Sequence, residues 1–64
     1  MEYAIIFGLL GHAGALRMPL EELDVDELEP GREFIHQGRI YEIRSVVNIP
    51  EGVQLNVVLA MDSA

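Results

Sequence analysis

The sequence predicts a mainly β domain, in which four or five antiparallel strands form a small sheet or an open barrel with one short helical turn. Apolar and polar residues alternate through residues 53–61, and a period of two is typical of a half-buried strand. Turn-forming residues separate the apolar runs in the second half of the chain, and the only segment with helical character is short. Because the chain has 64 residues, we expect residues 1–64 to form a single domain.

Residues 3–10 (YAIIFGLL) predict the first strand. The run contains isoleucine and aromatic residues and is apolar on both sides, which is typical of a strand buried on both faces. A helix through this region would contain glycine, which costs about 1 kcal/mol relative to alanine. Residues 11–14 then predict a turn, and residues 15–18 predict a second short strand that ends at Pro19.

Residues 20–29 (LEELDVDELE) form the only segment that could be helical. Its leucines could share one face of a helix, but Asp24-Val25-Asp26 interrupts the segment with residues of poor helix propensity. We therefore expect one helical turn near residues 20–28, or a helix of two turns at most, ended by Pro30-Gly31.

Three consecutive antiparallel strands are predicted for the second half of the chain. Residues 33–36 and 39–49 flank a turn at Gln37-Gly38, and residues 53–61 follow a turn at Pro50-Glu51-Gly52. Side chains of one parity are expected to face the core in the strand at 39–49: Tyr41, Ile43, Val47 and Ile49. The corresponding side chains in the last strand are Val53, Leu55, Val57, Leu59 and Met61.

The apolar content is high for so short a chain. Half of the residues are apolar, yet a domain of this size buries only about 60% of its unfolded surface. Residues 3–10 are apolar on both faces, and Val58 and Ala60 lie on the otherwise polar side of the last strand. One small sheet can hardly cover both surfaces, so we expect a homo-oligomer or a position in a larger assembly.

The residue types that are missing argue against an enzyme. The chain has no Cys, so it has no disulfide and no thiolate zinc site, and no Lys, so it has neither a P-loop lysine nor a Schiff-base lysine. Ser45 and Ser63 are the only alkyl hydroxyls, and Ser45 lies inside a predicted strand without a nucleophile elbow. We therefore expect no catalytic residues and no cofactor.

The sequence also bears on location. The longest apolar run has eight residues, against about 20 for a membrane-spanning helix. Glu2 stands where a secretion signal carries positive charge, and the lack of Cys fits a reducing compartment. We expect a soluble protein without membrane contact, either cytoplasmic or, if the protein is viral, within a virion.

Acidic residues are concentrated in one stretch of a chain whose net charge is −7. Seven of the eleven carboxylates lie within residues 21–33. Six of them are candidate partner-binding residues: Glu21, Glu22, Asp24, Asp26, Glu27 and Glu29. A solvated charged face is the alternative interpretation. A calcium loop is not predicted, because Glu29 and Ile35 occupy the positions where that loop needs glycine and glutamate.

Neither the histidines nor the glycines predict a ligand site. His12 and His36 are the only histidines, and nothing in their spacing brings them together with a carboxylate to bind zinc, so we expect surface histidines and no metal. Gly8, Gly11 and Gly14 have the spacing GxxGxxG, not the GxGxxG of a dinucleotide-binding turn, and tight turns account for them.

The charge distribution argues against nucleic-acid binding. Binding of DNA or RNA relies on clustered Lys and Arg that neutralise phosphates. The four arginines are spread along the chain, and the net charge repels a polyanion. An acidic face that imitates nucleic acid and binds a basic protein is consistent with the same charge.

One family resemblance rests on three short motifs. Gly14-Ala-Leu-Arg-Met-Pro19, then Glu21-Glu22-Leu23, then Leu28-Glu29-Pro30-Gly31 together resemble the swapped-hairpin barrels of AbrB and MazE-type regulators. The resemblance covers about eighteen residues. It implies an intertwined homodimer, although the basic residues that read DNA in that family are missing here and a long strand at 53–61 is added. SH3-like and swapped-hairpin barrels both satisfy the expected architecture.

Three functional hypotheses follow. The first is a non-enzymatic protein-interaction module that assembles with itself or docks as an accessory subunit on a larger assembly, such as a viral particle. The second is an acidic inhibitor or nucleic-acid mimic that occupies a basic protein surface. The third is a swapped-hairpin transcriptional regulator or antitoxin.

Overall fold

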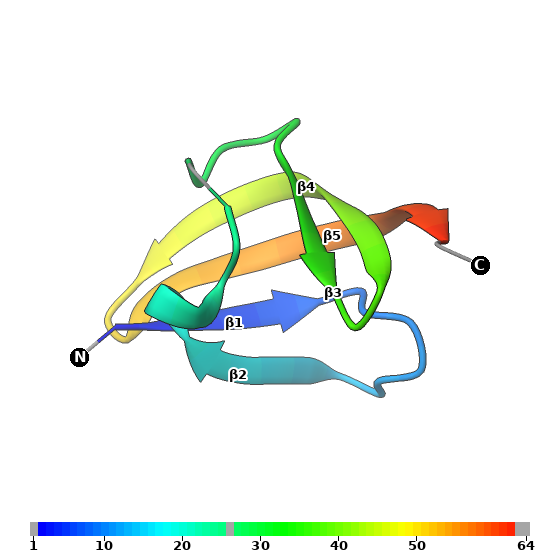
Figure 1. Cartoon of the computed structure of the whole chain (residues 1–64). Coiled ribbons are helices and arrows are strands. Elements are labelled where there is room, and N and C mark those ends of the chain that lie inside the picture. The colour runs from blue at the N-terminus through cyan, green and yellow to red at the C-terminus, as the bar shows by residue number, and fades with distance from the viewer. Residues whose placement is uncertain (1, 26, 63–64) are drawn as a thin grey trace.

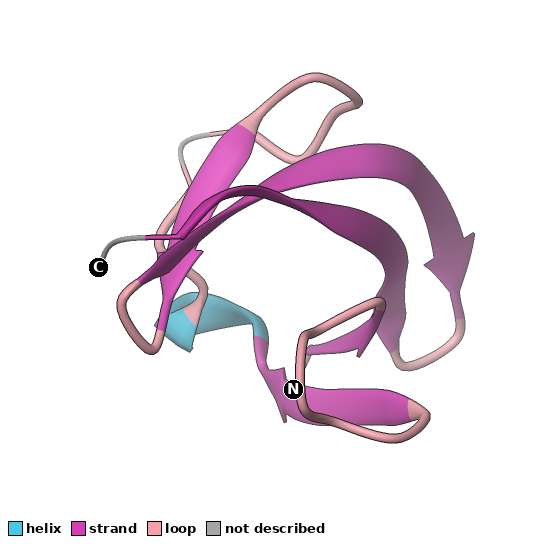
Figure 2. Ribbon diagram, turned by 90° about the vertical axis from the view of Figure 1, so that its right-hand side faces the viewer, coloured by secondary structure: helices cyan, strands magenta, loops and turns pink. Residues whose placement is uncertain are grey.

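Five strands form one strongly curved sheet in the computed structural model, which describes residues 2–25 and 27–62 (Figure 1). The sheet rolls into a half-barrel that is open on one side (Figure 2). In sequence order the elements are β1 (Tyr3–Phe7), β2 (Ala15–Pro19), the 3-10 turn η1 (Leu20–Glu22), β3 (Glu33–His36), β4 (Arg39–Ile49) and β5 (Gly52–Asp62). Across the sheet the strand order is β2-β1-β5-β4-β3.

The prediction of a mainly β fold is confirmed, but the expectation of a purely antiparallel sheet is wrong. β1 is antiparallel to β2 and parallel to β5, so the sheet is mixed. The alternation of residues identifies a strand without revealing its neighbours. The β3-β4-β5 meander is antiparallel, as the tight turns predicted.

Two glycines allow the parallel seam between β1 and β5 to close. At one end of the seam, a Cβ atom on Gly52 would collide with the backbone of Tyr3, and the Tyr3 N–H donates to the Glu51 carbonyl at 2.9 Å. At the other end, Gly8 has a φ of +101°, and a Cβ atom there would collide with the Val57 carbonyl oxygen. Only glycine permits this approach of two backbones.

The predicted helical segment forms a single 3-10 turn, η1, and nothing longer within the described residues. The rest of the segment is fixed to the inward side of the sheet by apolar contacts, because Leu23 is buried and Val25 and Leu28 pack against the core. Backbone bonds then tie its end to β4: the Gly31 N–H donates to the Ile43 carbonyl, and the Ile43 N–H donates to the Arg32 carbonyl, each at 2.8 Å.

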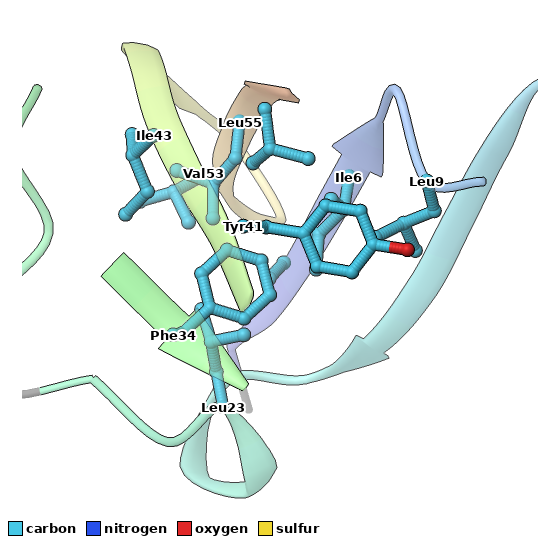
Figure 3. Close-up of a cluster of buried hydrophobic side chains, with 10 residues drawn as sticks. Ile6, Leu9, Leu23, Phe34, Tyr41, Ile43, Val53 and Leu55 are labelled. Atoms are coloured by element: carbon cyan, nitrogen blue, oxygen red, sulfur yellow. The ribbon is translucent and has the colours of Figure 1, made fainter. Parts of the chain in front are cut away.

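The core lies on the inward, concave face of the half-barrel (Figure 3). Its centre is the pair Phe34 and Tyr41, whose rings stack with centroids 5.8 Å apart. The Tyr41 hydroxyl accepts a hydrogen bond from the Leu10 N–H at 3.2 Å, which ties the β1–β2 loop to the core. The core comprises Ala4, Ile6, Leu9, Leu23, Phe34, Tyr41, Ile43, Val53, Leu55 and Val57. Burial of each large aliphatic side chain stabilises the fold by about 1.5–3 kcal/mol.

A bulge in β4 corrects the prediction for that strand. Ile43 pairs with Val57 but Ser45 pairs with Asn56, so Arg44 is an extra residue in β4. The residues that face the core are odd-numbered before this bulge and even-numbered after it. Tyr41 and Ile43 are buried as predicted, whereas Val46 packs against the core and Val47 is 48% exposed. The prediction that Val47 and Ile49 share a face with Tyr41 is therefore wrong.

A second register shift affects β5. Ile40 pairs with Met61 and Tyr41 with Leu59, so Ala60 is the extra residue here. Leu59, which was predicted for the core, is 39% exposed. β1 pairs with β5 only as far as Phe7 and Asn56, so the later residues of β5, including Leu59, have no neighbour in β1. The side chain of Met61 lies outside the described part of the structure.

The prediction that the first strand is buried on both faces is also wrong for the described structure. Ala4 and Ile6 are fully buried on the inward face, but Ile5 and Tyr3 are half-buried and Phe7 is 37% exposed. The reason is that no other element among residues 2–25 and 27–62 packs on the outward face of the sheet.

Candidate functional site

The outward face of the sheet is the first candidate site. The strand registers place its residues in three rows that cross β2, β1, β5 and β4. We use the term outward face for these rows, which are Ala15–Phe7–Asn56–Ser45, Arg17–Ile5–Gln54–Val47 and Pro19–Tyr3–Gly52–Ile49.

The outward face combines apolar side chains with the polar residues Arg17, Ser45, Gln54 and Asn56, and it contains no carboxylate. Its only charged residue is Arg17, whose guanidinium carbon lies 3.8 Å from the centre of the Tyr3 ring in a cation–π contact. Its polar groups satisfy one another where Asn56 Nδ2 donates to Ser45 Oγ at 2.8 Å. Acidic side chains first appear one row further along the sheet, where Glu42 lies opposite Glu33.

The acidic candidates divide into two groups. Glu21, Glu22 and Asp24 are exposed on or just after η1. Glu27 and Glu29 are exposed as well, but both bind Arg32, with Nη2 to Oε1 distances of 2.6 Å and 3.0 Å. Such exposed pairs contribute at most about 1 kcal/mol each. Asp26 lies outside the described residues.

A pocket at the opening of the half-barrel is the second candidate site. It lies where the β1–β2 loop, β2, η1 and the turn between β3 and β4 come together, and its volume is about 340 Å³. The residues that line it are Leu9, Leu10, Gly11, His12, Leu16, Met18, Glu22, His36 and Gln37. Because β2 and β3 are the two edges of the sheet, the pocket occupies the gap that a closed barrel would lack.

The structure places the two histidines at the same pocket. The spacing of His12 and His36 indicated nothing that joins them, yet both line this pocket, together with Glu22. His12 is exposed, and its Nε2 lies 3.1 Å from the Ala15 carbonyl oxygen. His36 is half-buried, with its ring 6.4 Å from that of Tyr41. No group of three potential ligands among the described residues is arranged to hold a metal ion.

Other residues considered for chemistry lie apart from the pocket. Ser45 is on β4, where its hydroxyl oxygen accepts the hydrogen bond from Asn56. The Gly8 backbone lies against that of Val57, so a close approach, and not a phosphate, explains this glycine.

Sequence reasoning missed most of both sites. Alternation placed Val47 in the core, and only the bulge at Arg44 brings it to the outward face. The apolar walls of the pocket, Leu10, Leu16 and Met18, come from one end of the chain, and His36 comes from a distant hairpin. The sequence signal that was available was the apolar character of residues 3–10 on both sides of the strand.

Comparisons of the chain with protein-family models, with curated proteins and with solved structures give no match. The likeness to swapped-hairpin regulators therefore stays a prediction. No helix within residues 2–25 and 27–62 is long and apolar enough to cross a membrane.

Proposed function

We propose that this chain is a non-enzymatic protein-interaction module that assembles with itself, or docks as an accessory subunit on a larger assembly such as a viral particle, through its outward face. The observation that carries the proposal is a set of three rows without any carboxylate, in a chain whose net charge is −7. Phe7 and Val47, which are 37% and 48% exposed, are two of the exposed large apolar residues of the described chain, and both lie in these rows.

Burial of this face would stabilise a complex by about 25 cal/mol per Å² of apolar surface. The distribution of charge supports a second copy of the chain as one partner that could bind the outward face. The segment that carries Glu21, Glu22 and Asp24 packs on the inward side through Leu23. Two copies that meet at their outward faces would therefore keep these carboxylates away from the contact.

The test is the molar mass in solution at high salt. At about 1 M NaCl the screening length is ~3 Å, so an apolar contact persists while contacts through carboxylates weaken. We expect light scattering at micromolar concentration to give a particle larger than the 7.1 kDa of one chain. A folded particle of that single-chain mass would contradict self-assembly.

A matched pair of variants locates the contact. Val47→Glu places a carboxylate in the middle row of the outward face and should reduce the mass to that of the monomer. Ile35→Glu introduces the same charge at a more exposed apolar residue, 59% against 48%, but on β3 and outside the three rows. It should leave the mass unchanged. Dissociation by both variants, or by Ile35→Glu alone, would contradict the assignment to the outward face.

A second candidate function is that of an acidic inhibitor or nucleic-acid mimic. It is favoured by the exposure of Glu21, Glu22 and Asp24 on one short segment. Such a function predicts binding to a basic protein that weakens steeply as salt is raised, whereas assembly through the outward face does not.

Nucleic-acid binding tests the third candidate, a swapped-hairpin regulator. We expect no complex with DNA or RNA tighter than about 1 μM at physiological salt, because the chain offers no cluster of cations to replace phosphate counterions. Filter binding or fluorescence anisotropy with duplex and single-stranded oligonucleotides measures this. Tighter binding that falls with salt would contradict the expectation and favour the regulator.

A further inference from the structure

The pocket at the opening of the half-barrel combines an apolar wall with one carboxylate. Leu9, Leu10, Leu16 and Met18 supply the wall. Polar groups come from η1 through Glu22, from the β1–β2 loop through His12, and from the end of β3 and the turn after it through His36 and Gln37. No arginine belongs to the described lining, so Glu22 is the only residue there that carries a full charge when the imidazoles are neutral.

We propose that this pocket binds an arginine side chain of a basic partner polypeptide, with Glu22 as the counter-ion of the guanidinium group. The site is separate from the outward face, and it does not depend on how the chain assembles.

The size and the lining fit that side chain. Pockets that hold small ligands span about 300–1,000 Å³, and a volume of about 340 Å³ is at the low end, where a single side chain suffices. The methylene groups of an arginine would lie along Leu16 and Met18, as long cationic side chains do on apolar surface.

The polar groups favour a guanidinium over an ammonium. A guanidinium can bind a carboxylate with two N–H groups and can stack on planar rings, whereas an ammonium is a compact and strongly hydrated charge. Glu22 offers the carboxylate, and His12 and His36 offer the rings. The chain pairs its own arginines in both ways: Arg17 lies over the Tyr3 ring, and Arg32 binds two glutamates.

The walls of the pocket are held before any ligand arrives. The Leu10 N–H bond to the Tyr41 hydroxyl fixes one side of the loop, and the contact of His12 Nε2 with the Ala15 carbonyl oxygen fixes the other. Binding to such a preformed site loses less conformational entropy than binding to a mobile loop.

Proton NMR of the two imidazoles provides a direct test. His12 and His36 are the only histidines in the chain, and both line the pocket, so their ring resonances report its occupancy. The probe is Nα-acetyl-arginine N-methylamide, and the matched probe is the citrulline derivative, which replaces the guanidinium with a neutral urea of similar shape. We expect the arginine probe to shift both sets of resonances in a saturable way and the citrulline probe to bind more weakly by about twofold to fivefold.

Two variants separate the pocket from the general negative charge. Glu22→Gln should weaken binding of the arginine probe by about twofold to fivefold. Glu21→Gln makes the same change on the neighbouring residue of η1, which is exposed but does not line the pocket, and should leave the affinity unchanged. The unaltered dispersion of the amide resonances would show that both variants are folded.

Three results would overturn the proposal: no saturable shift with the arginine probe, equal binding of the citrulline probe, or equal weakening by the two variants. These outcomes are independent of the assembly test. Val47→Glu should change the molar mass without changing the affinity for the arginine probe, so either proposal can fail while the other stands.

Discussion

Both faces of this sheet carry large apolar residues, but those residues have different surroundings. On the inward face, Ile6, Ile43 and Leu55 are fully buried, because the sheet curves around them and the segment at Leu23 packs against them. On the outward face, Phe7 and Val47 stay partly exposed. Alternation in a strand therefore assigns residues to opposite faces, but the apolar character of a face does not show that the chain itself covers it.

The largest expected difference between the faces comes from neighbouring residues of β5. Val57→Asp places a carboxylate in the core and should unfold the domain, because burial of an unpaired charge costs several kcal/mol, which is comparable to the whole stability of so small a fold. Asn56→Asp makes a carboxylate of similar size on the outward face and should change the free energy of unfolding by less than about 0.5 kcal/mol. Urea denaturation followed by circular dichroism measures both.

Equal tolerance of these two changes would show that the assignment of faces in β5 is wrong. Asn56→Asp has a second use, because it adds a carboxylate to the face that we propose for assembly. A normal unfolding curve together with a reduced molar mass would separate folding from assembly at this position.

An intermediate effect is expected on the two sides of the bulge in β4. Val46→Ala removes methyl groups that pack against the core and should destabilise the fold by about 1–2 kcal/mol. Val47→Ala makes the identical change at the exposed neighbour and should cost less than about 0.5 kcal/mol. Thermal unfolding at low protein concentration, which limits assembly, compares them. A larger loss of stability for Val47→Ala than for Val46→Ala would mean that odd-numbered residues of β4 still face the core after Arg44.

The smallest effect concerns the Tyr41 hydroxyl, which lies on the inward face. Tyr41→Phe removes the acceptor of the Leu10 N–H and should destabilise the domain by about 1 kcal/mol. Hydrogen exchange gives a local readout, since the Leu10 amide should exchange faster in the variant while the amides of β5 change less. An unchanged rate for Leu10 would show that this bond does not hold the loop.

The sequence was most informative where turns and hydrogen bonds are local. The segments at 33–36 and 39–49 form strands with the predicted bounds, because Gln37-Gly38 sets a tight turn between them. The bulges at Arg44 and Ala60 were not predictable, since one extra residue in a strand leaves the composition of that strand unchanged. The parallel pairing of β1 with β5 depends on residues far apart in sequence, and no periodicity encodes it.

The candidate sites were less predictable than the strands. The exposed acidic residues Glu21 and Glu22 follow from composition, because carboxylates stay in water. The position of Glu22, His12 and His36 around one pocket does not, because it depends on how the two edges of the half-barrel approach each other. Their role in binding stays a prediction.

The parallel seam between β1 and β5 has a consequence for the order of folding. The β3-β4-β5 meander and the β1–β2 hairpin each join neighbours in sequence, whereas the seam pairs Tyr3 with Gly52 and requires a long loop to close. Strand pairings between residues so far apart in sequence are expected to form slowly, because the loop between them must close first. Until the hairpin docks, the edge of β5 that receives β1 presents unpaired backbone groups that can accept a strand from another molecule. The glycines that bracket the seam, Gly8 and Gly52, are therefore needed for this late pairing to close, because a Cβ atom at either position would collide with the facing backbone.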